Sequence, residues 1–173
     1  MLKLIFPVVL FFICNFSFGQ TKHEWIDIKL NIKHSKRIPN NFVEISIERN
    51  RVNKKVVNVE IKSKPFKGAK GWENSSIDTV FTASLENYSK IVESIKYLKQ
   101  EDFYNNFSLM GVDGYNAILT FGSSSNSITY NVFSPTFNTK NRKLNPFLET
   151  CELIVDYVDL NFENIFEKKN LPK

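Results

Sequence analysis

Apolar and polar residues alternate without interruption in three successive stretches of this chain, residues 26–32, 43–48 and 57–61. A period of two residues sends every apolar side chain of a strand to the same face. The links between the stretches are short and rich in charged and turn-forming residues, and His34 lies in the first of them. This pattern favours an antiparallel meander with one buried face and one face in water.

Two further strands are predicted in the second half of the chain. Residues 115–121 and 128–133 flank residues 122–126, a Gly-Ser-Ser-Ser-Asn loop that is typical of a hairpin. Pro135 ends the second of these strands, because proline has no N–H to donate to a sheet. Residues 77–81 indicate a short additional strand.

Two amphipathic helices are predicted, one on either side of this hairpin. The first runs from residue 85 to about residue 99, and the Ser84 hydroxyl is expected to cap its free N–H groups. The second starts at Asn145-Pro146, an expected capping side chain followed by a proline in the first turn. In each helix, apolar residues recur at steps of three and four. The second helix is predicted to bury Phe147, Leu148, Cys151, Ile154, Val155 and Val158.

The predicted order of elements is β-β-β-(β)-α-β-β-α, in which the bracketed strand is residues 77–81. A sheet with one apolar face needs a cover, and each helix has one apolar stripe to bury. The sequence therefore predicts an α+β fold, an antiparallel sheet of about five or six strands with two helices packed on one face.

Residues 1–19 have the pattern of a cleavable secretory signal peptide. A lysine precedes an apolar run over residues 4–14, which is too short to span a bilayer. Ser17 and Gly19 supply the small side chains that signal peptidase requires, so cleavage is expected after Gly19. An uncleaved anchor, the alternative, fits the short run less well. We therefore expect residues 20–173 to form a single exported domain, periplasmic or extracellular, with no membrane span after cleavage.

Composition limits the partners and the compartment. The net charge of the chain is +5, a mild excess that does not by itself indicate nucleic acid, and no nucleic-acid partner is expected. Of the two cysteines, only Cys151 lies beyond the predicted cleavage point, so an internal disulfide in the mature chain is excluded. An exported protein without disulfides is typical of a bacterial envelope. Because Cys151 falls on an apolar helix stripe, we expect its thiol to be buried and unreactive.

No arrangement of residues in the sequence predicts catalysis or cofactor binding. The two histidines, His23 and His34, show none of the spacings of a zinc site, and no nucleophile motif accompanies them. The serines of residues 122–126 lie between two strands, whereas a nucleophile elbow lies between a strand and a helix. Glu101-Asp102 and Asp113 leave one alternative open, a hydrolase that uses a carboxylate pair. We otherwise expect no catalytic residue, no metal and no cofactor.

Candidate binding residues fall into an acidic group and a basic group. The acidic group recurs at steps of three and four, so a helix places it on one side, where it suits either water or a basic protein partner. The basic group suits an anionic polymer of the envelope, but a solvated sheet edge that resists aggregation is the favoured interpretation. The acidic group is Glu149, Glu152, Asp156 and Asp159, and the basic group is Arg49, Arg51, Lys54, Lys55, Lys67 and Lys70.

Several short motifs follow one another in the second half of the chain. The first predicted helix is followed by Met-Gly-Val-Asp-Gly-Tyr at 110–115, by Phe-Ser-Pro at 133–135, by residues 138–142 and by the last helix. In this order, from about residue 76 to residue 160, the chain resembles small exported, immunity-like α+β proteins of bacteria. The resemblance implies a fold and brings no catalytic residues with it.

Together these observations favour a non-enzymatic binding protein of the bacterial cell envelope, such as an immunity or inhibitor protein. Two alternatives stay open. One is an envelope hydrolase with a carboxylate pair, and the other is a structural accessory protein that binds a polymer.

Overall fold

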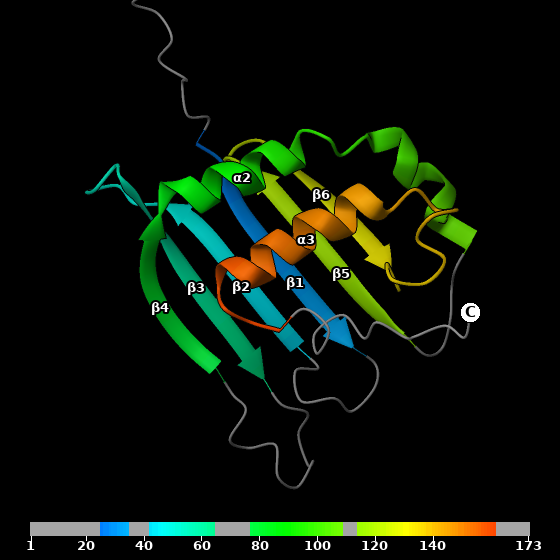
Figure 1. Cartoon of the computed structure of the whole chain (residues 1–173), viewed down its shortest axis with the longest axis horizontal. Helices are drawn as coiled ribbons and strands as arrows, with labels where there is room; N and C mark the ends of the chain where they lie inside the picture. Colours follow the sequence, from blue (N-terminus) through cyan, green and yellow to red (C-terminus); the bar gives the residue numbers. More distant parts are fainter. Residues whose placement is uncertain (1–24, 35–41, 65–76, 109–113, 162–173) are drawn as a thin grey trace, which may run out of the picture.

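The computed structural model describes residues 25–34, 42–64, 77–108 and 114–161, which hold six strands and two α-helices (Figure 1). The helices are α2 (Leu85–Ile95) and α3 (Asn145–Tyr157), and a 3₁₀ segment, η2 (Gln100–Ser108), follows α2. The strands are β1 (Asp27–His34), β2 (Phe42–Arg49), β3 (Val56–Lys64), β4 (Ile77–Ser84), β5 (Tyr115–Gly122) and β6 (Ser127–Phe133).

The six strands form one antiparallel sheet in the order β4-β3-β2-β1-β5-β6. β1 lies in the interior of the sheet, where Leu30 is opposite Ile45 of β2 and opposite Leu119 of β5. From β4, at one edge, the chain passes through α2 and η2 and returns as β5 on the other side of β1. The predicted α+β class and order of elements are confirmed, and the strand expected over residues 77–81 is a full strand of eight residues.

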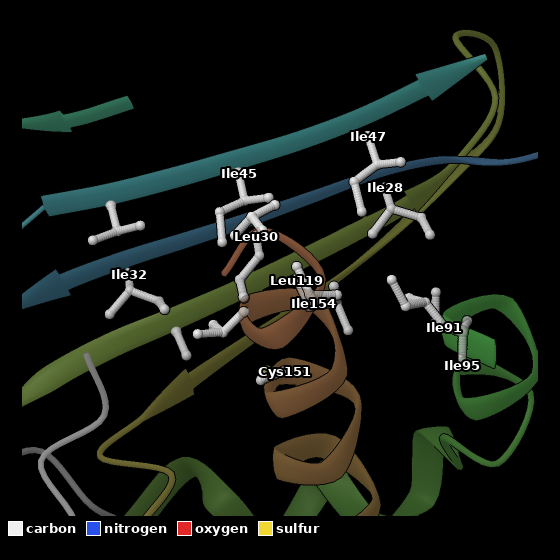
Figure 2. Packing of buried hydrophobic residues seen from close by; sticks show 14 of the residues in the cluster. Ile28, Leu30, Ile32, Ile45, Ile47, Ile91, Ile95, Leu119, Cys151 and Ile154 are labelled. Carbon is white, nitrogen blue, oxygen red and sulfur yellow. The ribbon is translucent and has the colours of Figure 1, made fainter. Parts of the chain in front are cut away.

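α2 and α3 contact each other and lie on the same face of the sheet (Figure 1). The alternating apolar residues of the strands point toward them and form the core with the inner faces of both helices. Figure 2 shows Leu30 and Leu119 of the sheet near Ile154 of α3 in this layer. Neither helix of the described chain has the length and the apolar run that crossing a bilayer requires.

The first helix is shorter than predicted and is not capped as predicted. α2 ends at Ile95, and the chain continues through a turn into η2. Ser84 does occupy the N-cap position, but its hydroxyl makes no capping hydrogen bond. Instead the Ser84 carbonyl accepts a hydrogen bond of 2.8 Å from the Tyr157 hydroxyl, which links the start of α2 to the end of α3.

The second helix also starts and ends differently from the prediction. Its N-cap is Leu144, so Asn145 lies inside α3 and makes no side-chain cap, although proline does occupy the first turn. α3 ends at Tyr157, and Asp159 lies beyond it with a left-handed backbone, φ 58°. This backbone conformation prevents α3 from extending further, because a residue at positive φ cannot continue a right-handed helix.

His34 lies in the sheet and not in the turn where the sequence placed it. It is the last residue of β1, it is buried, and it pairs with Tyr115 of β5. The two rings stack with their centres 4.4 Å apart. The alternation of β1 continues two residues further than the apolar residues alone indicated, because an imidazole ring can fill a core position when it is stacked on an aromatic neighbour.

Candidate binding surfaces

The acidic residues predicted on the second helix are only partly on it. Glu149 and Asp156 are exposed side chains of α3, and Glu152 is half-buried. Asp159 is exposed too, but it follows the C-terminus of the helix. These four residues are called the α3 acidic surface below.

The two helices differ in how their acidic side chains are compensated. On α2, the Lys90 ammonium lies 3.7 Å from the Glu86 carboxylate, and Lys96 lies 2.9 Å from Glu93. No member of the α3 acidic surface pairs with a lysine or arginine in the part of the chain that the structure describes. Within that part, the negative charges of α3 therefore repel one another at steps of three and four without relief.

The basic residues predicted to bind polyanions are only partly placed. At the β2–β3 turn the structure exposes Arg49, Arg51, Lys54 and Lys55, whereas Lys67 and Lys70 lie outside the described residues. The Arg49 guanidinium covers the ring of Trp25, with its central carbon 5.0 Å from the ring centre. A cation–π contact of this kind gives Arg49 a structural role, because it holds the chain before β1 against the end of β2.

The structure places two of the three carboxylates named for the hydrolase alternative. Asp102 is half-buried and lies 3.7 Å from the Lys143 ammonium, which ties η2 to the segment before α3. Glu101 is exposed, and Asp113 lies outside the described residues. Among the residues described, no three His, Cys, Asp or Glu side chains come together as metal ligands could.

Cys151 is a fully buried residue of α3, as the helix spacing predicted. Figure 2 shows it on the helix among the core side chains. Burial raises the pKa of its thiol, because the apolar surroundings disfavour the charged thiolate. The thiolate is the reactive form of cysteine, so the folded state suppresses its chemistry.

We expect Cys151 to stay unmodified when the native protein meets a thiol reagent, and to react completely once denaturant exposes it. A reagent that releases a coloured thiolate when it reacts with cysteine lets absorbance measure the reaction rate of the native and of the denatured protein. Ser124→Cys, in the exposed hairpin loop, is the matched control and should react at once in the native state. Equal native rates at the two positions would contradict the burial of Cys151.

Two sequence motifs of the second half of the chain, residues 133–135 and 138–142, meet around one arginine. Arg142 Nη1 donates to the carbonyl oxygens of Ser134 at 2.7 Å and Phe137 at 3.0 Å. Its Nη2 donates to the carbonyl of Phe133 at 2.8 Å. These bonds fix the segment between β6 and α3, so a structural role accounts for the residues of this region.

A groove that the sequence did not predict lies on the open face of the sheet, opposite α2 and α3. It has a volume of about 330 Å³ and is lined by Ser46, Glu48, Asn58, Val59, Glu60 and Val80. These residues come from β2, β3 and β4, which are neighbours in the sheet. The one signal in the sequence was a serine between two glutamates at the polar positions of β2. Alternation alone could not show which side chains of β3 face that serine.

No family model matches this chain, and no curated protein matches it at a significant level. The fold and the surfaces therefore define its class, a two-layer α+β protein with an acidic helix surface and an open sheet face that carries a groove.

Proposed function

We propose that this is a non-enzymatic binding protein of the bacterial cell envelope, of the immunity or inhibitor kind, whose α3 acidic surface contacts a basic protein partner. One observation carries the proposal. The acidic residues of α2 have lysine partners, whereas those of α3 have none in the described chain.

Electrostatics supports a partner of opposite charge. Two like charges at steps of three or four cost a helix a few tenths of a kcal/mol, on the order of 0.2–0.5 per pair. A basic surface removes this repulsion on binding and also attracts the acidic surface over a distance, which raises the association rate. Exposed Glu149 and Asp156 are available for such contacts at opposite ends of α3.

Export belongs to the same proposal and is supported by the sequence alone. The apolar run over residues 4–14 and the small residues Ser17 and Gly19 support cleavage after Gly19. The structure has no bearing on it, because residues 1–24 lie outside the described part of the chain.

Charge reversal on α3 tests the contact. The double variant Glu149→Lys/Asp156→Lys should slow association with the partner purified from the envelope fraction by about tenfold, because steering depends on the sign of the charge. Biolayer interferometry at low and high salt measures the rate, and salt should reduce the difference. The thermal midpoint should change little, since both side chains are exposed.

The matched control makes the same charge change on the neighbouring helix. Glu86→Lys/Glu93→Lys alters the net charge equally, at exposed positions of α2, and should leave association within about twofold. If both variants lost association rate equally, the effect would come from net charge and not from a contact at α3. If neither variant lost association rate, the proposed contact would be wrong. A large loss of stability in the α3 variant would show that the acidic residues stabilise the fold.

A further inference from the structure

Ser46 forms the floor of the groove on the open face of the sheet. It is 7% exposed, although Ile45 and Ile47 beside it on β2 point into the core on the opposite face. The residues opposite it on the neighbouring strands are Lys29 and Glu60. A small side chain surrounded by long ones lies at the bottom of a depression, which explains the groove.

Among the described residues, the side-chain oxygen that is fully enclosed without a partner is Asn31 Oδ1, so the Ser46 hydroxyl is not sealed inside the protein and is open to the groove. Its β2 position and the lining of the groove place it in the depression. It can both donate and accept, so it suits a polar group that enters the groove.

The charge at the rim of the groove is negative. Glu48 is exposed and forms no ion pair with any described residue. The Glu60 carboxylate lies 2.6 Å from the Lys62 ammonium, and Glu44 lies 2.9 Å from Lys29. Glu48 therefore supplies the uncompensated charge, so the groove repels anions and attracts a cation.

The remaining walls match the shape of a long cationic side chain. Val80 of β4, opposite Glu60 in the register, is 68% exposed and offers an apolar surface to an aliphatic stem. Glu48 and Glu60 lie diagonally on adjacent strands, a relation that places two residues about 7–8 Å apart, with their Cβ atoms somewhat closer. A planar guanidinium has five donors in a fixed fork, which can reach two carboxylates and the hydroxyl between them, whereas an ammonium is a compact point charge.

We propose that this groove binds the guanidinium group of an arginine side chain presented by a peptide or protein. Glu48 and Glu60 accept its N–H donors, Ser46 accepts one on the floor, and Val80 packs on the methylene stem. The groove and the α3 acidic surface lie on opposite faces of the sheet, so this site does not depend on the proposed function.

A titration followed by ¹⁵N-NMR tests the site, with Nα-acetyl-L-arginine methylamide as the probe. We expect saturable shifts of the backbone amides of Ser46, Glu48 and Glu60, with a Kd on the order of millimolar for one exposed charged contact. The neutral isostere, Nα-acetyl-L-citrulline methylamide, should give no saturable shift. The lysine analogue should bind at least about threefold more weakly, because it lacks the fork.

Two variants and one control locate the interaction. Glu48→Gln should weaken binding of the arginine probe about fivefold, and Ser46→Ala should weaken it about twofold while keeping the small floor residue. Glu86→Gln removes the same charge from α2, on the other side of the sheet, and should leave the Kd unchanged. Shifts confined to α3, equal binding of the citrulline or lysine probe, or an unchanged Kd for Glu48→Gln would each overturn the assignment.

Discussion

Replacing Arg142 with methionine is expected to lower the free energy of unfolding by about 3 kcal/mol. Methionine keeps an unbranched stem but removes the guanidinium that donates to the carbonyls of Phe133, Ser134 and Phe137. A hydrogen bond to a charged group contributes about 1.5–3 kcal/mol. Arg142 is only half-buried, so in the variant water can hydrogen-bond to the freed carbonyl groups. The expected loss of free energy is therefore well below the sum for three hydrogen bonds.

Backbone strain makes this segment depend on the contacts of Arg142. Ser134, Asn138 and Lys143 have φ values of 42°, 50° and 54°, a region that residues with a side chain rarely adopt. Such residues cost on the order of 1 kcal/mol each and persist only where the surroundings hold them. Arg142 is the group that binds this segment at several points, so its loss should release the segment as a unit.

Urea unfolding followed by circular dichroism measures the effect. Lys140→Met removes a cation from an exposed position in the same segment and should change stability by less than about 0.5 kcal/mol. Arg142→Lys should fall between the two, because an ammonium cannot reach three carbonyls at once. A loss for Arg142→Met no larger than that for Lys140→Met would show that the segment is held by other contacts.

The parts of the fold that the sequence predicted depend on local patterns. Each alternating run became a strand, because a period of two is a property of consecutive residues and needs no knowledge of the neighbours. The apolar stripe of α3 likewise predicted the burial of Cys151. The ends of the elements were predicted less accurately. Asn145, for example, was expected to cap α3 but lies inside it.

Features that join distant residues could not be predicted. The groove exists because the register places Ser46 between Lys29 and Glu60, residues of two other strands. The role of Arg142 depends on carbonyls that precede it by five to nine positions in a loop without periodicity. His34 was placed in a turn because its neighbours in sequence are polar, whereas its ring stacks on Tyr115 of another strand.

The packing of Phe147 brings several elements together beneath η2. Its side chain is 1% exposed on the first turns of α3. The ring of Phe103, from η2, meets it edge to face, with centres 5.7 Å apart and planes inclined by 75°. Phe103 in turn stacks on Tyr130 of β6, with centres 4.1 Å apart. The three aromatic rings therefore connect α3, η2 and the edge of the sheet.

Phe147→Ala is expected to lower the free energy of unfolding by about 4 kcal/mol, within the range of about 3–5 for a buried phenylalanine. The lost free energy has two parts. One is the apolar area that is no longer buried, and the other is the cost of a cavity that α3, η2 and β6 cannot fill by moving. Phe137→Ala, at a phenylalanine that is 52% exposed, is the matched control and should lose less than about 1 kcal/mol. In a double-mutant cycle with Phe103→Ala, the coupling energy should be about 0.5–1.5 kcal/mol, as for other edge-to-face pairs. Urea unfolding of the four proteins gives all of these values, and a coupling near zero would mean that the two rings stabilise the protein independently of their contact.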